Sequence, residues 1–401
     1  MGSVALSLEQ FLPEDGFAGT LVGRAWITTT TSTPGQVGGP AVIAIREGGI
    51  YDISEAAPTM CELLEAPNPA ASVKAARGKK IAGVEELVGN SGRERFNPQK
   101  PFLLAPCDLQ VIKAAGVTFA SSLIERVIEE QARGNPARAE AVRKQVVGLI
   151  GENLRTVKPG SPQAMQIKQL LIEQGLWSQY LEVGIGPDAE VFTKAPVLSS
   201  VGTGADIGIH PDSAWNNPEP EIVLAVNSRG ETVGATLGND VNLRDFEGRS
   251  ALLLPKAKDN NASCAIGPYI RLFDATFSID DVRQSTVNLL VEGEDGFTLR
   301  GASSMSQISR DPLDLVTAAM GRYHQYPDGM VLFLGTMFAP TEDREQPGSG
   351  FTHKVGDIVR ISSSMLGALV NRVDHSDRIA PWTFGLRALL AKLSACQNVQ
   401  S

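Results

Sequence analysis

The sequence predicts an α+β fold in which a large, mostly antiparallel β core carries a helical segment and a small N-terminal α/β domain. Three observations support this fold class. Short β-type runs, separated by Gly, Pro, Asn and Asp, fill most of the chain after Gly184. Apolar residues recur every three or four positions between Asp108 and Leu181, as they do on one face of a helix. A pair of β segments followed by an amphipathic stretch precedes both regions.

The N-terminal part is predicted to form the small α/β domain. Residues 41–54 (AVIAIREGGIYDIS) contain two β segments that meet at a Gly-Gly turn. Residues 59–66 follow with the amphipathic pattern of a short helix. The polar, turn-rich residues 90–101 have the composition of a linker or a long surface connection. We therefore place the domain boundary near residue 105, which predicts domains of residues 1–105 and 106–401.

Three helical stretches are predicted between the two β regions, over residues 122–131, 137–154 and 161–181. Ser161 and Pro162 predict the start of the third, because serine caps helices well and proline is tolerated at the first helical position. We find no glycine-rich phosphate loop at the start of a helix in the sequence, which argues against a nucleotide-binding fold.

The β core is predicted from short runs that are separated by turn residues. Many short strands of this kind favour hairpins and an antiparallel sheet over a doubly wound parallel sheet. The runs are EIVLAVN (221–227), ETVGATLG (231–238), STVNLLVEG (285–293), FTLRGA (297–302), GMVLFLG (329–335) and DIVRISSS (357–364).

Composition excludes several classes of function. The chain has 36 Lys and Arg against 45 Asp and Glu, and we find no basic stripe that would suit a nucleic-acid backbone. Its 4 cysteines form no CxxC pair and its 4 histidines are dispersed, which argues against disulfides and zinc. We find neither a signal segment nor an apolar run long enough to span a bilayer. These observations predict a soluble, cytoplasmic protein without a nucleic-acid or membrane partner.

Three carboxylates are predicted to converge on one site. Glu219 and Glu221 are two residues apart at the start of a β run, so their side chains point to the same side. If residues 228–230 form a hairpin turn, the next run returns Asp240 to the same end. Such a cluster suits Mg²⁺, Mn²⁺ or Ca²⁺. The alternatives are a solvated strand face for the glutamates and an ordinary turn position for Asp240.

Lys258 follows the hairpin region, in a segment that reads as strand, loop and strand. Most lysines are solvated surface residues. Beside a bound divalent cation, however, the pKa of a lysine would be lowered by like charge, and a neutral amine is a competent base.

The chain resembles the fumarylacetoacetate hydrolase superfamily over roughly residues 106–380, because several motifs occur in order. The motifs are PEPE (218–221), NDVNLRDFE (239–247), KDNNASCAIGP (258–268), GMVLFLGT (329–336) and KVGDIVRISSSMLGALVN (354–371). The resemblance implies that Glu219, Glu221 and Asp240 bind magnesium and that Lys258 is the catalytic lysine. It also implies substrate contacts, which would come from Ser199, Ser200, Arg244 and Thr336.

One departure from the family pattern changes the expected reaction. Hydrolases of this family carry an N-Y-x-x-H-x-x-E-like motif, and the corresponding residues here are TFASSLIE (118–125). Ser122 stands where the histidine would be, while Glu125 keeps the position of the glutamate. Without that imidazole, hydrolysis of a C–C bond by the usual pair of residues is not expected. Glu125 then becomes the candidate general acid, or a solvated helix residue.

With its long N-terminal extension, the chain resembles the dehydratase branch of the family, which acts on 2-keto-3-deoxy sugar acids. This implies a magnesium-dependent hydro-lyase that converts 2-keto-3-deoxy-D-arabinonate to 2-oxoglutarate semialdehyde and water in non-phosphorylative pentose catabolism. It also implies a homodimer or higher homo-oligomer. The alternatives are an acylpyruvate or fumarylpyruvate C–C bond hydrolase, and a non-catalytic sugar-acid binding protein.

Overall fold

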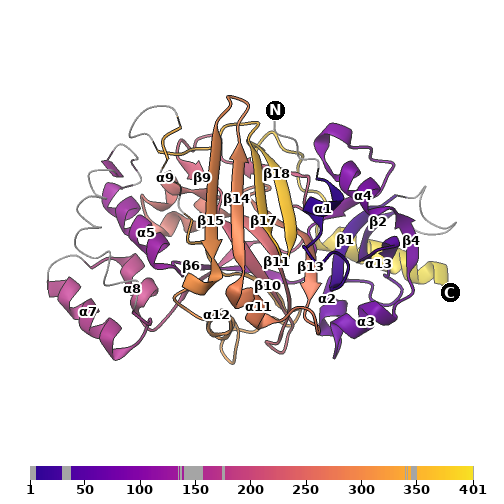
Figure 1. The fold of residues 1–401 in the computed structure, drawn as a ribbon, viewed down its shortest axis with the longest axis horizontal. Helices are drawn as coiled ribbons and strands as arrows, with labels where there is room; N and C mark the ends of the chain where they lie inside the picture. The colour runs from indigo at the N-terminus through magenta and orange to yellow at the C-terminus, as the bar shows by residue number, and fades with distance from the viewer. Residues whose placement is uncertain are drawn as a thin grey trace.

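The computed structural model describes residues 6–28, 38–133, 135, 138–139, 157–173, 177–338, 340, 342–344 and 350–400. A single 11-stranded sheet runs through the molecule, and most of its neighbouring strands are antiparallel (Figure 1). In spatial order its strands are β4 (Lys79–Ala82), β3 (Gly49–Asp52), β2 (Gly39–Arg46), β1 (Thr20–Ile27), β13 (Cys264–Leu272), β11 (Thr232–Asp240), β10 (Pro220–Val226), β16 (Met330–Phe333), β6 (Val111–Gly116) and β7 (Glu190–Ala195), with β5 (Phe102–Leu104) paired to β1.

A second sheet of five strands packs against the large one. It consists of β15 (Thr298–Ser304), β14 (Thr286–Glu292), β17 (Ile358–Ser363), β18 (Gly367–His375) and β8 (Asp206–Ile209). The main hydrophobic core lies where the two sheets meet, and it includes Leu224 and Leu237 of the large sheet and Leu289 and Ile361 of the smaller one. A short pair, β9 (Asn216–Asn217) and β12 (Asn242–Leu243), stands beside them.

Short helices surround the sheets. They are α1 (Leu8–Phe11), α2 (Met60–Glu65), α3 (Pro69–Ala75), α4 (Val84–Ser91), α5 (Ala120–Ala132), α7 (Pro162–Glu173), α8 (Gln179–Ile185), α9 (Arg244–Glu247), α10 (Leu254–Lys258), α11 (Ile279–Gln284), α12 (Pro312–Ala319) and α13 (Leu386–Gln400), with single 3₁₀ turns at Arg93–Arg95, Ala251–Leu253 and Met305–Gln307. None of the helices in the described part of the chain is long and apolar enough to cross a bilayer.

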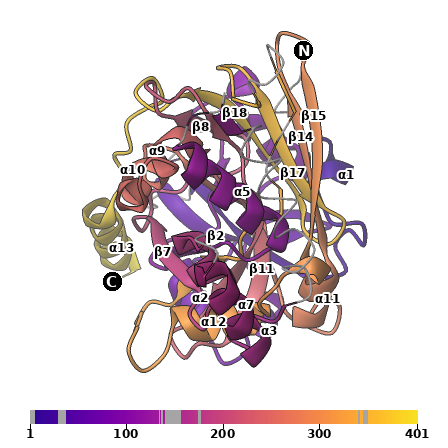
Figure 2. The ribbon, with the colours of Figure 1, turned by 90° about the vertical axis from the view of Figure 1, so that its left-hand side faces the viewer.

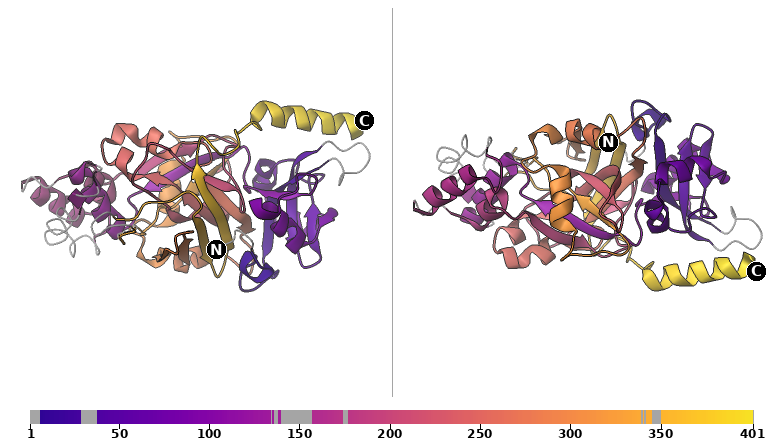
Figure 3. Two further views of the ribbon diagram at one scale, coloured as in Figure 1. Left: turned by 90° about the horizontal axis from the view of Figure 1, so that it is seen from above. Right: turned by 90° about the horizontal axis from the view of Figure 1, so that it is seen from below.

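The predicted N-terminal hairpin and helix are confirmed. β2 and β3 pair antiparallel up to Arg46 and Gly49, and α2 follows with Thr59 as its N-cap. Because β1 also pairs with β13, these strands extend the large sheet. The boundary at residue 105 therefore does not interrupt the sheet, and the division into two domains stays a prediction. At this end of the molecule α13 runs beside the N-terminal strands, where Lys392 donates to the Pro40 carbonyl oxygen (Figure 3).

The helical segment lies at the opposite end from α13 (Figures 1 and 3). The first predicted helix is α5, and α7 begins at Pro162, with the Ala164 backbone N–H donating to the Ser161 hydroxyl as the sequence predicts. Most of the predicted helix at residues 137–154 falls outside the described residues. In Figure 2, where this end faces the viewer, α5 lies in front of the sheets. Its inner face covers the end of the β10 and β11 hairpin and so closes one side of a cavity.

Candidate active site

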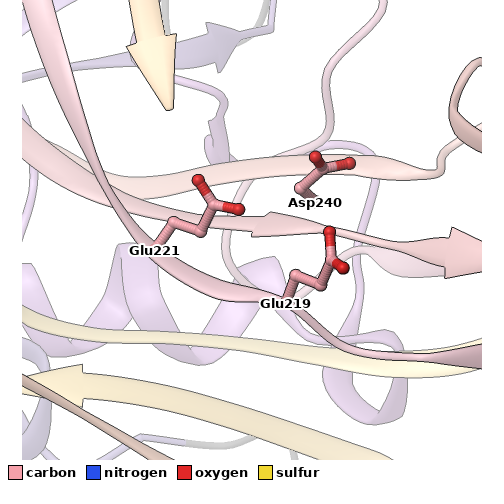
Figure 4. Close-up of side chains that lie close together, drawn as sticks. All are labelled: Glu219, Glu221 and Asp240. Carbon is pink, nitrogen blue, oxygen red and sulfur yellow. The ribbon is translucent and has the colours of Figure 1, made fainter. Parts of the chain in front are cut away.

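The β10 and β11 hairpin brings the three predicted carboxylates together. The strands are antiparallel with Pro220 opposite Asn239, and the Asp240 backbone N–H donates to the Glu219 carbonyl oxygen at 3.1 Å. Glu219 and Glu221 flank Pro220 and point to the same side as Asp240 (Figure 4). One carboxylate oxygen from each side chain lies within 4.8 Å of the other two, and all three residues are buried. The predicted convergence is therefore observed, while ion binding itself stays a prediction.

Glu221 lacks a cationic partner among the described residues. Its Oε2 accepts a hydrogen bond of 2.6 Å from the backbone N–H of Gly335, which follows β16. Burial, with the charges of Asp240 and Glu219, raises the pKa of Glu221 well above that of an exposed glutamate. A buried carboxylate in this position is stabilised in its charged form by a cation.

Lysine side chains face the other two carboxylates. Lys258, at the end of α10, forms ion pairs with Glu219 and, at 3.0 Å, with Asp240. The fully buried Lys194 of β7 lies 3.0 Å from the other oxygen of Asp240. Burial alone would raise the pKa of Asp240, but these two lysines outweigh it and hold the pKa below the usual aspartate value. Asp240 is thus held as a carboxylate beside Glu221.

The protein groups alone raise the pKa of Lys258, whereas the sequence-based expectation of a lowered pKa concerns the site with a bound cation. Burial would lower the pKa of Lys258, but the nearby carboxylates, above all Asp240 and Glu219, outweigh it and raise the pKa above that of a free lysine. The expectation of a lowered pKa applies beside a bound cation and stays a prediction, and the two carboxylate contacts act against it. Among the protein groups alone, Lys258 is an ammonium that bridges two of the predicted metal ligands.

The donor set fits a hard divalent cation. Among the described residues that line the cavity, seven carry carboxyl groups and three carry basic groups. The acidic residues are Glu125, Glu129, Glu190, Glu219, Glu221, Asp240 and Glu247, and the basic ones are Arg126, Arg244 and Lys258. Oxygen ligands and an excess of negative charge are what Mg²⁺ and Ca²⁺ require. Lys194, behind Asp240, offsets only one further charge.

Helix α5 supplies a charged network that meets the carboxylates. Arg126 forms ion pairs with Glu219 and, at 3.0 Å, with Glu247, and it also pairs with Glu129 one turn along the helix. This contact joins α5 directly to a predicted metal ligand. The sequence analysis missed Arg126, because an arginine in a helical pattern reads as solvated surface and nothing local shows that it is buried.

Arg244 and Glu125, both predicted site residues, belong to the same network. The Arg244 guanidinium is buried, pairs with Glu129 at 2.6 Å and Glu125 at 3.4 Å, and stacks on Trp215 with its carbon 4.3 Å from the ring centre. It also donates to the Pro340 carbonyl oxygen. With these partners Arg244 anchors α5 to the cavity wall. A substrate contact by Arg244 remains a prediction.

Glu190 at the start of β7 is a cavity residue that the sequence analysis did not single out. Its carboxylate packs against Gly116, where a Cβ would lie 2.1 Å from Oε2. Burial, together with the negative charge of Glu247, raises the pKa of Glu190 to about 7. A carboxyl group with this pKa can accept and release a proton at neutral pH. The only sequence signal is a single acidic residue at a strand end, which is too common to identify a site.

The predicted substrate contacts divide into two groups. Thr336 lines the cavity beside Gly335, as does Ser122, which occupies the position of the family's histidine. Ser199 and Ser200 are not among the described residues that line the cavity. Ser199 donates its hydroxyl to the Pro196 carbonyl oxygen, and the Ser200 hydroxyl lies 3.5 Å from the sulfur of Cys107. Ser199 thus contacts the residue after β7 and Ser200 the segment before β6, so the structure does not bring them to the site.

Replacing Gly335 with alanine is expected to lower the free energy of unfolding by about 3 kcal/mol or more. Gly335 has φ +86°, and a Cβ there would lie 2.0 Å from the Thr118 hydroxyl oxygen. Gly230→Ala is the matched control, because that turn glycine has φ +79° with nothing within 4 Å of a Cβ and should cost only about 1 kcal/mol. Urea unfolding of both variants measures the difference. Equal losses would show that the close approach at Gly335 does not matter.

Comparisons with known proteins agree with this architecture. The family model described as the C-terminal part of fumarylacetoacetate (FAA) hydrolase matches residues 171–374. A Haloferax volcanii protein named probable 2-keto-3-deoxyxylonate dehydratase is 33% identical over 201 residues, which are 50% of this chain and 65% of that protein. The 2-dehydro-3-deoxy-D-arabinonate dehydratase of Saccharolobus solfataricus is 32% identical over 193 residues, 47% of this chain and 60% of that one. The matches thus span less than two thirds of these relatives.

Solved structures show the same fold. The apo form of 2-keto-3-deoxy-D-arabinonate dehydratase aligns over 88% of this chain and 99% of its own, with a TM-score of 0.61 and 21% identity. The structure described as complexed with magnesium and 2,5-dioxopentanoate aligns with a TM-score of 0.60 and the same identity, over 88% of this chain and 99% of its own. The predicted α+β fold class is therefore confirmed. Because the family model covers half of its length, the chain belongs to the fumarylacetoacetate hydrolase family.

Proposed function

We propose that this protein is a magnesium-dependent hydro-lyase that removes water from a 2-keto-3-deoxy sugar acid. The proposed reaction converts 2-keto-3-deoxy-D-arabinonate to 2-oxoglutarate semialdehyde, in non-phosphorylative pentose catabolism. The observation that carries the proposal is the buried carboxylate triad in a cavity whose described lining contains no histidine. The names of the two curated relatives support the same substrate class. A homodimer and a cytoplasmic location stay predictions from the sequence.

The metal would be held by Glu219, Glu221 and Asp240, with Mn²⁺ or Ca²⁺ as alternatives to Mg²⁺. A divalent cation bound there would orient a 2-oxo acid and draw electrons from its 2-oxo group, which makes the C3 protons more acidic. The Lys258 ammonium touches two of these carboxylates. In that form it contributes fixed positive charge beside the reacting atoms, and it can accept a proton from C3 only after losing its own.

Glu190 is our candidate for moving the proton. As a carboxylate it accepts a proton from C3, and as an acid it donates one to the C4 hydroxyl, which leaves as water. The resulting C3=C4 double bond then tautomerises, with protons moving from C5 and its hydroxyl to C3 and C4, to give the semialdehyde. Its pKa of about 7 lets both forms exist at neutral pH. Glu125, which also lines the cavity, remains the alternative donor to the departing hydroxyl. Thr336 and Arg244 remain candidates for contacting the substrate.

The Glu190→Gln variant is expected to lower kcat/KM by about 100-fold or more, on the usual scale for acid–base groups. In the wild type the carboxylate fraction of Glu190 rises with pH through about 7, so kcat/KM should rise with pH over that range. A bound cation favours the carboxylate form of Glu190, so it shifts this rise in kcat/KM to lower pH. The measurement is a pH profile of both proteins. If the kcat/KM of the variant rises with pH as in the wild type and stays within tenfold of it, Glu190 does not move the proton.

Two rival functions use the same site. An acylpyruvate or fumarylpyruvate hydrolase would need the same cation but would cleave a C–C bond, and a sugar-acid binding protein would bind without reaction. One enzyme preparation assayed with 2-keto-3-deoxypentonate and with an acylpyruvate separates the three. We expect turnover of the sugar acid alone. Faster cleavage of the acylpyruvate would favour the hydrolase, and binding without turnover of either compound would favour the binding protein.

A further inference from the structure

Asn217 is a cavity-lining residue with an unsatisfied acceptor. It lies in β9, two residues before Glu219, lines the cavity and is only 2% exposed. Its side-chain N–H donates to the Pro218 carbonyl oxygen at 2.9 Å, which settles the orientation of the amide. Its Oδ1 is buried and has no hydrogen-bond partner among the residues that the structure describes. Leaving a buried polar atom unpaired is costly, so a native structure is expected to supply a partner.

The residues around the cavity do not offer that partner. Most polar groups in the lining are carboxylates, which accept hydrogen bonds as Oδ1 does. Two of the basic lining residues are engaged with carboxylates, because Arg126 pairs with Glu129, Glu219 and Glu247, and Lys258 pairs with Glu219 and Asp240. An acceptor fixed in this way is complementary to a hydroxyl group, and it repels a carbonyl or carboxylate group at the same place.

We propose that Asn217 Oδ1 accepts a hydrogen bond from the C5 hydroxyl of the substrate and thereby selects hydroxylated 2-oxo acids. This inference rests on the proposed function. A neutral amide cannot protonate a leaving group, so it is unsuited to the C4 hydroxyl, which departs as water. The C5 hydroxyl stays in place while water is lost and becomes the aldehyde of the product only in the later tautomerisation, so until then it needs only a neutral acceptor. Acylpyruvates with a plain alkyl end carry no donor there, so the same amide disfavours them.

A trapped water is the competing explanation. Asn242 stands opposite Asn217 in the β9 and β12 pair, and both atoms of its buried amide also lack partners within the described ranges. Side chains of directly opposed residues share one face of a strand pair, so a single water could satisfy both amides. Such a water would stabilise the protein without distinguishing one ligand from another.

The test compares two ligands that have no C4 hydroxyl to lose, 2-oxopentanoate and 5-hydroxy-2-oxopentanoate, by calorimetry with Mg²⁺ present. We expect the wild type to bind the hydroxylated ligand about 5- to 10-fold more tightly, which corresponds to one hydrogen bond. In Asn217→Leu this ratio should fall to about 1 or below, with the affinity for 2-oxopentanoate little changed. Asn217→Ala is the second variant should the leucine protein not fold. Asn242→Leu is the control, because Asn242 is not among the lining residues, and it should keep the ratio.

The inference is overturned if the ratio of the two affinities in Asn217→Leu and Asn217→Ala stays at its wild-type value. It is also overturned if these variants lose affinity for both ligands in parallel, which is the result expected for a trapped water. Neither ligand can be dehydrated, so the ratio is independent of turnover. If the wild type turns over 2-keto-3-deoxypentonate while the variants keep the ratio, only the role of Asn217 fails. If the ratio behaves as expected without turnover by the wild type, the dehydratase proposal fails and the hydroxyl selectivity stands. A wild type that binds neither ligand would overturn both.

Discussion

The Glu221→Gln variant is expected to lose metal binding and turnover, and yet to unfold less readily than the wild type when no metal is added. The carboxylate of Glu221 is 3% exposed, accepts only from the Gly335 N–H and has no cationic partner in the described part of the chain. Glutamine keeps the shape and the acceptor oxygen but removes the cost of burying an ionisable carboxyl group beside Glu219 and Asp240. We expect the free energy of unfolding to rise by about 1–2 kcal/mol as a result.

The measurement is thermal unfolding with and without Mg²⁺, beside metal calorimetry and a turnover assay. The wild type should gain about 2.7 kcal/mol at a metal concentration 100 times its Kd, and Glu221→Gln should gain nothing. Turnover should fall by at least about 1,000-fold. Glu182→Gln is the control, because Glu182 pairs with Lys168 on the surface of the helical segment. Normal metal binding by Glu221→Gln would remove Glu221 from the site.

The Lys258→Met variant is expected to have the opposite stability profile and also a large loss of rate. Removal of the Lys258 ammonium deprives Glu219 and Asp240 of a buried ion-pair partner. The metal-free protein should therefore be less stable by about 3 kcal/mol or more. The affinity for Mg²⁺ should rise by about tenfold or more, because a competing positive charge has gone. Turnover should nevertheless fall by about 100- to 1,000-fold.

Lys256→Met is the matched control for this variant. Lys256 lies on the same short helix, exposed over the Phe246 ring, and should change neither metal affinity nor rate appreciably. Metal titration and initial rates of both variants at saturating Mg²⁺ make the comparison. A Lys258→Met enzyme with a rate within tenfold of wild type would exclude Lys258 from the chemistry. A weakened metal affinity would contradict the competition between ammonium and cation.

The carboxylate triad could be predicted from sequence because local geometry determines it. Residues two apart in a strand share a side, and a hairpin closed at residues 228–230 fixes which residue of the second strand faces Glu219. The helix start at Ser161 and the hairpin before α2 were predictable for the same reason, since capping and turn residues act over a few positions.

The cations and Glu190 could not be predicted in this way, because their positions depend on contacts between distant segments. Arg126 meets Glu219 across 93 residues of sequence, and Lys194 meets Asp240 from a strand at the edge of the sheet. Burial of these side chains follows from how α5 and β7 pack on the hairpin, and no local pattern records it. The contacts of Lys258 with two carboxylates were unpredictable for the same reason, since Glu219 and Asp240 come from the β10 and β11 hairpin.

The most direct test of the central claim is a coupled assay for 2-oxoglutarate semialdehyde, started with D- or L-2-keto-3-deoxypentonate. A semialdehyde dehydrogenase that reduces NAD⁺ reports each product molecule as absorbance at 340 nm. We predict rapid product formation with Mg²⁺, abolition by EDTA, and recovery when Mg²⁺ is restored in excess. Product formation that persists undiminished in EDTA would contradict metal dependence, and the absence of semialdehyde from either enantiomer with Mg²⁺ present would contradict the proposed dehydratase.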